Sequence, residues 1–130
     1  MMNEIIFYSY PSCTSCRKTK KWLKGNNIQF QEKHIFRETP NKEEMMKILS
    51  LTTEGIDEIL ATRSQTFKDL GIDVNELSLS QLIELIIEEP KLLRRPIITS
   101  GKKLIVGYNE SALQKLSRQK SKFELKQSVS

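Results

Sequence analysis

The sequence has no long apolar run, and this absence limits where the protein acts. None of its stretches approaches the ~20 consecutive apolar residues that a membrane-spanning helix needs. The first residues, Met1-Met2-Asn3-Glu4, have neither the basic start nor the apolar core of a signal peptide. We therefore expect a cytoplasmic protein without a membrane partner, in a compartment that keeps thiols reduced.

Internal repeats and linkers rich in glycine or proline are also absent from the sequence. A chain of 130 residues that is 38% hydrophobic and 28% charged is long enough to bury one core. We therefore expect a single domain over residues 1–130.

Soft metal ligands are scarce, because the chain has two cysteines, Cys13 and Cys16, and one histidine, His34. A zinc site would need two ligands beyond the cysteine pair, and His34 is the only other soft candidate. We expect no metal and no other cofactor, and we assign His34 no chemistry. A disulfide between near neighbours closes almost no loop and adds little stability, which favours a reversible role for the pair. The plain alternative is a chance pair of buried cysteines.

Positive charge is in modest excess. The formal net charge is +5 at pH 7 and the isoelectric point is near 9.2. This balance fits contact with nucleic acid or with an acidic protein surface, but it also fits simple solubility. Charge alone does not choose among the three.

The order of apolar patterns predicts an α/β fold. Residues 4–10 are apolar and β-branched and predict a buried strand, residues 15–25 have helical spacing, and residues 28–35 alternate like a second strand. Such a βαβ unit implies parallel strands and a right-handed crossover. It places both cysteines at the N-terminus of the helix.

Helices dominate the middle of the chain, and a hairpin follows them. We expect helical segments over 41–51, 55–61, 64–70 and 80–88. After Pro90, residues 96–99 and 103–107 predict two hairpin strands. A last helix is expected from about Asn109, and the basic tail beyond it is expected to fray.

The position of the cysteine pair at a helix N-terminus favours redox chemistry. Unpaired N–H groups and the positive end of the helix dipole stabilise a thiolate, so Cys13 is the expected nucleophile. Arg17, one turn along, adds positive charge, and Arg95 adds more if the fold brings it near. Cys16 is three residues on and on the same face, where it can attack an oxidised Cys13.

Several motifs together resemble the Spx family of the arsenate reductase/Spx superfamily. The matching stretches run from residue 4 to about 112 and are far more specific than a lone Cys-x-x-Cys. They are Tyr10-Pro11-Ser12-Cys13-Thr14-Ser15-Cys16-Arg17-Lys18, Thr53-Glu54-Gly55-Ile56-Asp57-Glu58-Ile59, Thr62-Arg63-Ser64, Leu92-Leu93-Arg94-Arg95-Pro96-Ile97-Ile98 and Val106-Gly107-Tyr108-Asn109-Glu110.

The resemblance implies both a fold and a function. The fold is thioredoxin-like, with a mixed four-stranded sheet, an inserted helical subdomain at about 41–90 and a flexible basic tail at about 118–130. The function is that of a regulator without enzyme activity. It binds the C-terminal domain of the RNA polymerase α subunit and alters promoter choice under thiol stress, reaching promoter DNA only through the polymerase complex. The free protein is expected to be a monomer.

The resemblance also assigns roles to single residues. Cys13 and Cys16 become the redox switch, Gly55 lies at the α-subunit contact, and Arg95 senses or transmits the disulfide state. Arg63 and Arg94 join Arg17 in a basic surface for an acidic partner or for promoter phosphate.

Plainer roles remain open for two of these residues. Gly55 fits a turn or helix start equally well. Arg95 precedes Pro96, which in thioredoxin-like folds is often cis and beside the active-site loop, but Arg95 also suits a surface ion pair.

Two enzyme functions are alternatives to the regulatory role. A glutaredoxin-coupled arsenate reductase would use Cys13 as nucleophile and Arg17, Arg63 and Arg95 to hold the oxyanion. Cys16 argues against it, because the reductases more often have serine there. A glutaredoxin-like thiol-disulfide reductase is the third reading, but it needs neither the basic tail nor the inserted helices.

The chain end departs from the family pattern. Gln127-Ser128-Val129-Ser130 lacks the small apolar terminus through which some members are delivered to the ClpXP protease. The sequence therefore leaves open whether the ClpXP protease is a partner that degrades this protein.

Overall fold

A four-stranded mixed sheet forms the centre of the computed structural model, which describes residues 4–116. The strand order is β2-β1-β3-β4, so the first strand is internal. β1 pairs with β2 in parallel and with β3 in antiparallel, and β3 pairs with β4 in antiparallel. The strands are β1 (Ile5–Ser9), β2 (Gln31–His34), β3 (Ile97–Ser100) and β4 (Lys103–Val106). The predicted α/β thioredoxin-like class is confirmed.

The crossover helix α1 (Thr14–Gly25) joins the two parallel strands. Its buried side chains are Cys16, Thr19 and Leu23, which follow one another at helical spacing. The helix ends because the Ile28 N–H turns back to the Leu23 carbonyl at 3.0 Å. The predicted βαβ unit is therefore present.

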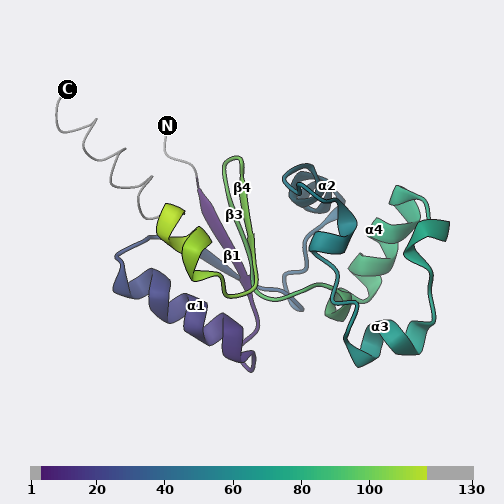
Figure 1. The fold of residues 1–130 in the computed structure, drawn as a ribbon, viewed down its shortest axis with the longest axis horizontal. Coiled ribbons are helices and arrows are strands. Elements are labelled where there is room, and N and C mark those ends of the chain that lie inside the picture. Colours follow the sequence, from purple (N-terminus) through teal and green to yellow (C-terminus); the bar gives the residue numbers. More distant parts are fainter. Residues whose placement is uncertain (1–3, 117–130) are drawn as a thin grey trace.

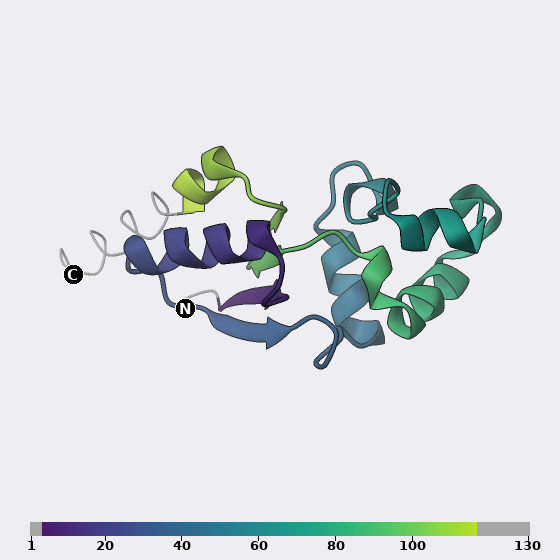
Figure 2. The same ribbon diagram turned by 90° about the horizontal axis from the view of Figure 1, so that it is seen from below.

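One face of the sheet is covered by α1 and by the helix over residues 110–116, which lie on the same side of the strands in Figure 2. Leu23, Leu113 and Leu116 pack there against Phe7 and the inward residues of the hairpin.

The other face of the sheet meets the helices between β2 and β3. Tyr8 from β1 packs with Met45 of α2 (Lys42–Ser50) and Ile86 of α4 (Leu79–Glu88). Figure 1 shows these helices and α3 (Gln65–Leu70) gathered at one end of the molecule. Short 3₁₀ turns connect them, η1 (Ile56–Glu58), η2 (Val74–Glu76) and η3 (Pro90–Leu92).

The helix starts follow the capping rules that the sequence displays. Asn41 and Ser78 each form a reciprocal capping box with the residue three places on. Ser64 accepts the Phe67 N–H at 3.1 Å and begins α3.

Two predicted elements are shorter in the structure. The helix expected over 55–61 is only the turn η1, because Ile59 and Ala61 bond instead to backbone groups of Arg94 and Leu92. The strand expected over 28–35 begins only at Gln31, because Ile28 closes the end of α1. The expected tail at 118–130 lies outside the described residues. Within residues 4–116, no helix is long and apolar enough to cross a membrane.

Candidate redox site

The cysteine pair lies where β1 ends and α1 begins. A tight turn, closed by the Cys13 N–H on the Tyr10 carbonyl at 3.0 Å, carries the chain from strand to helix. Cys13 is half-buried, whereas Cys16 is 2% exposed. Only the first sulfur is therefore within reach of a reagent in solvent.

Both sulfurs accept hydrogen bonds from backbone N–H groups at the start of the helix. Cys13 is the N-cap residue, and its Sγ accepts the Cys16 N–H at 3.3 Å. The Cys16 Sγ accepts the Tyr10 N–H at 3.4 Å. Both cysteines are free, and the contact of the Cys13 Sγ with the Cys16 backbone N–H makes the two residues close neighbours at the start of the helix.

Burial raises the pKa of the Cys16 thiol to about 12, and the hydrogen bond and negative charge of Cys13 act in the same direction. The Tyr10 N–H and the Arg95 guanidinium oppose this shift. Cys16 is therefore a thiol at neutral pH.

Arg95 is held beside the pair by aromatic rings. Its guanidinium carbon lies 5.2 Å from the centroid of Phe36 and 5.9 Å from that of Tyr10. The Arg95–Pro96 peptide bond is cis, and Pro96 begins the approach to β3. The fold thus brings Arg95 to the cysteines, and we find no ion pair of Arg95 with a carboxylate among the described residues.

Sequence reasoning missed the ring cluster that holds Arg95. Tyr10, His34 and Phe36 contact one another with centroid separations of 4.7 to 6.0 Å. The His34 Nδ1 accepts the backbone N–H groups of Phe36 and Arg37, which shapes the turn after β2. The usable signal was the parallel register, because Ser9 pairs with His34 and both strands end at the same edge.

The remaining predicted arginines are exposed to solvent or form hydrogen bonds elsewhere in the fold. Arg17 is exposed on α1. The Arg94 Nε donates to the Leu60 carbonyl at 3.0 Å and so ties the η1 region to the segment before β3. Arg63 is exposed and has no hydrogen bond or ion pair to another described side chain.

Gly55 occupies an exposed loop before η1. Its φ of 83° and ψ of −154° lie in a region that only glycine adopts readily. The Glu58 carboxylate accepts the N–H groups of Thr53 and Glu54 at 2.9 and 3.2 Å and fixes the loop. A Cβ at Gly55 would meet nothing within 4 Å, so the backbone there is open to a partner.

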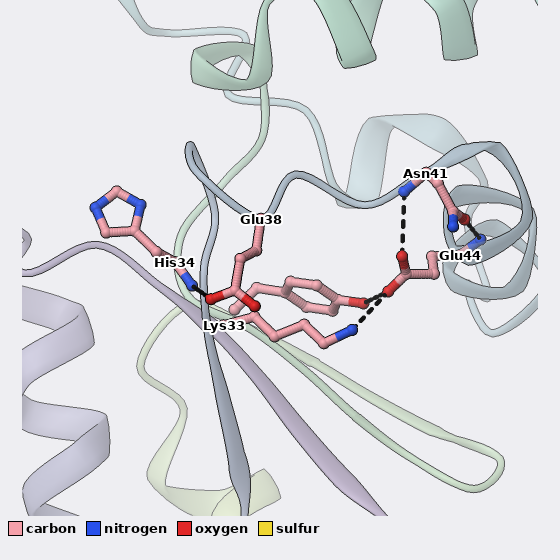
Figure 3. Close-up of polar contacts among 6 residues, drawn as sticks. Lys33, His34, Glu38, Asn41 and Glu44 are labelled. Atoms are coloured by element: carbon pink, nitrogen blue, oxygen red, sulfur yellow. Dashed lines mark hydrogen bonds and ion pairs between the residues drawn. The ribbon is translucent and has the colours of Figure 1, made fainter.

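A polar cluster links the sheet to α2 (Figure 3). The Glu44 carboxylate accepts the Tyr8 O–H at 2.7 Å and pairs with the Lys33 Nζ at 3.2 Å. Partial burial opposes ionisation of Glu44, but the Tyr8, Asn41 and Lys33 hydrogen bonds outweigh it and lower the Glu44 pKa. Burial and this carboxylate together raise the pKa of Tyr8. Among the described residues, no group of three or more His, Cys, Asp or Glu side chains could hold a metal ion.

Comparison with known proteins identifies the family of this chain. The sequence model of the ArsC family matches residues 8–116. The regulatory protein MgsR of Bacillus subtilis is 62% identical over 121 residues, which make up 93% of this chain and 96% of that protein. The global transcriptional regulator Spx of Lactiplantibacillus plantarum is 48% identical over 111 residues, 85% of this chain and 84% of that protein.

The structural comparison points the same way. An ArsC family related protein from Bacteroides fragilis superposes with a TM-score of 0.79 at 27% identity, covering 87% of this chain and 97% of that chain. The resemblance to Spx drawn from the sequence is confirmed. The chain belongs to the ArsC family, and within it to the branch of the Spx and MgsR regulators.

Proposed function

We propose that this protein is a cytoplasmic regulator that binds the C-terminal domain of the RNA polymerase α subunit and is switched by a Cys13–Cys16 disulfide. A regulatory role is supported by the names of its relatives. The observation that carries the redox part is the pair of free cysteines at the start of α1, where the Cys13 Sγ accepts the Cys16 N–H. The first cysteine is accessible and the second is buried.

The switch reaction balances with hydrogen peroxide as oxidant. The Cys13 thiolate attacks one peroxide oxygen, the O–O bond breaks, hydroxide leaves and Cys13 becomes a sulfenic acid. The Cys16 sulfur then bonds to the Cys13 sulfur and displaces a second hydroxide. Two thiols lose two electrons and two protons, and the peroxide becomes two molecules of water.

The surroundings of Cys16 favour the second step once the first has occurred. One of the causes that raise its pKa, the negative charge of Cys13, ends when Cys13 becomes a neutral sulfenic acid. The Tyr10 N–H and the Arg95 guanidinium remain, and both favour the Cys16 thiolate. Oxidation of Cys13 therefore activates its partner.

A bonded route supports transmission from the pair to the Gly55 loop. Arg95 follows Arg94 in the chain, and Arg94 holds the Leu60 carbonyl. Leu60 also pairs with Leu93, and the turn η1 lies just before Leu60. A shift of Arg95 on disulfide formation would thus move the end of the segment that carries Gly55.

Co-elution of the purified α C-terminal domain with the protein, reduced and oxidised, tests the proposal. We expect co-elution, and we expect Gly55→Arg to abolish it, because a large charged side chain would stand between backbone and partner. The matched control is Gly71→Arg, since Gly71 also has positive φ and open surroundings but caps α3.

A second variant, Asp57→Arg, separates a loss of contact from a backbone effect at Gly55. It changes the charge of an exposed residue in the adjacent turn η1, where φ is not positive. Failure of the unaltered protein to co-elute contradicts the proposed partner. Steady arsenite production from arsenate with glutathione and glutaredoxin would instead identify the reductase.

A further inference from the structure

His34 lies next to the redox site, although the switch as proposed gives it no role. It is the last residue of β2, at the edge of the sheet where β1 also ends. Its imidazole contacts the rings of Tyr10 and Phe36, with centroid separations of 5.6 and 6.0 Å. Figure 3 shows the imidazole directed away from the Lys33–Glu44 ion pair, so the ring takes no part in docking α2.

The imidazole of His34 accepts hydrogen bonds from the chain that follows it. Its Nδ1 accepts the Phe36 N–H at 3.2 Å and the Arg37 N–H at 3.3 Å. A ring nitrogen that accepts is unprotonated, so the imidazole is neutral and carries its hydrogen on Nε2. The Arg37 N–H also reaches the His34 carbonyl at 3.1 Å, whereas Nδ1 is the one acceptor of the Phe36 N–H that we find within residues 4–116. Nδ1 therefore fixes the Phe36 backbone.

The two rings that contact His34 are also the rings that hold Arg95. The Phe36 and Tyr10 centroids lie 4.7 Å apart, and the Arg95 guanidinium carbon is 5.2 and 5.9 Å from them. The Arg95 charge favours the Cys16 thiolate, and the Tyr10 N–H donates to the Cys16 Sγ at 3.4 Å. A continuous series of contacts thus leads from the imidazole to the buried sulfur.

We propose that His34 is a positioning residue for Arg95. Its Nδ1 holds the turn after β2 in the shape that places the Phe36 ring against Tyr10, and the two rings together bind the guanidinium beside Cys16. The inference rests on the proposed function in one respect, that Arg95 assists the attack of Cys16 on an oxidised Cys13.

Three variants separate positioning from a general loss of stability in the turn. His34→Asn keeps an acceptor bonded to Cγ, as Nδ1 is, and can bind the same two N–H groups. His34→Leu has no acceptor. The control is Thr39→Val, which removes a hydroxyl that donates to the Ile35 and Phe36 carbonyls at 3.0 and 3.3 Å in the same turn but leaves Nδ1 in place.

NMR of the reduced full-length chain tests the position of Arg95 without any oxidation step. Because the guanidinium lies over the Phe36 and Tyr10 rings, ring currents should shift the Arg95 Hδ resonances upfield in the unaltered protein. We expect this shift to be kept in His34→Asn and Thr39→Val and mostly lost in His34→Leu. The inference is overturned by an unshifted resonance in the unaltered protein, by a shift that survives in His34→Leu, or by equal losses in His34→Leu and Thr39→Val.

The lifetime of the Cys13 sulfenic acid, followed by rapid-quench dimedone trapping, tests the consequence for the switch. His34→Leu should prolong the lifetime several-fold, and His34→Asn should change it less than about twofold. In an Arg95→Met background, His34→Leu should add less than about twofold, because its effect passes through Arg95. Full additivity of the two changes would overturn the inference. If no Cys13–Cys16 disulfide forms in the unaltered protein, the proposed switch is contradicted, while the NMR comparison still decides the role of His34.

Discussion

At the scale of single residues, the two cysteines differ in exposure and in hydrogen bonding. Cys13 caps a helix and reaches solvent, while Cys16 is enclosed and bonded by a backbone N–H. An oxidant therefore meets Cys13 first. This order of events follows from the fold, because the cap position faces outward and the third helical position faces the core.

We expect Cys16→Ser to accumulate a sulfenic acid at Cys13 after peroxide treatment, because the resolving thiol is gone. Cys13→Ser should leave Cys16 mainly as a thiol, since its sulfur is buried. Dimedone labelling followed by mass spectrometry measures both outcomes. Equal oxidation of the remaining cysteine in the two variants would contradict the assigned order.

Arg95 affects the same reaction from the side of the ring cluster. Its charge lowers the pKa of Cys16 against the effect of burial, and Phe36 and Tyr10 hold it in place. Arg95 is thus a positioning residue for the second step.

Arg95→Met should prolong the life of the Cys13 sulfenic acid several-fold, because the Cys16 thiolate loses its favourable charge. Phe36→Leu should give a smaller effect in the same direction. The control is Arg37→Met, an exposed arginine next to Phe36. Rapid-quench dimedone trapping measures the lifetime, and an equal effect of the Arg37 change would assign the result to net charge.

At the scale of elements, α2 is attached to the sheet through its first turn. Glu44 closes the capping box with Asn41, and its carboxylate also accepts hydrogen bonds from the Tyr8 hydroxyl and the Lys33 ammonium group (Figure 3). One carboxylate therefore begins the helix and docks it on β1 and β2.

Glu44→Gln should lower the free energy of unfolding by about 1–2 kcal/mol at pH 7, because glutamine keeps the cap acceptor but loses the charge. Since the folded state lowers the Glu44 pKa, the stabilisation is present above its unfolded pKa of about 4.3 and is lost as pH falls below it. Urea titrations of both proteins should converge at low pH. Glu43→Gln on the same turn is the control, and a pH-independent difference would exclude the charge as cause.

The elements also show what the sequence could predict. The caps at Asn41 and Ser78 and the βαβ order are local, so the helix starts and the class of fold were predicted correctly. The segment after Gly55 has a helical pattern, but its backbone bonds go to residues more than 30 places away in the chain. The ring cluster around Arg95 likewise joins three segments that are distant in the chain, so no local sequence pattern predicts it.

At the scale of the whole molecule, one apolar cluster spans two halves, the sheet half and the helical half over residues 41–90. Tyr8 and Ile97 of the sheet pack in it with Met45, Ile83 and Ile86 of the helices. The helical half therefore has no separate core of its own in the described chain. We expect sheet and helices to unfold together.

Met45→Ala should cost about 2–5 kcal/mol, because Met45 is fully buried in this shared cluster. Fluorescence of Trp22, the single tryptophan, reports the α1 side of the sheet, and far-ultraviolet circular dichroism reports the helices. Both transitions should move to the same lower urea concentration. Met46→Ala is the control because Met46 is 44% exposed, and an unmoved Trp22 transition would show two independent units.

Charge is divided between the halves. Residues 41–90 contain eleven acidic and four basic residues, whereas residues 4–40 and 91–116 contain four acidic and thirteen basic residues. A long molecule with an acidic end and a basic end experiences a torque near a polyanion, so it turns its basic sheet half forward while still approaching. The rotational search for a productive encounter is shortened. At 0.1 M salt the field decays within about 10 Å, so this pre-alignment operates only over the last step of the approach.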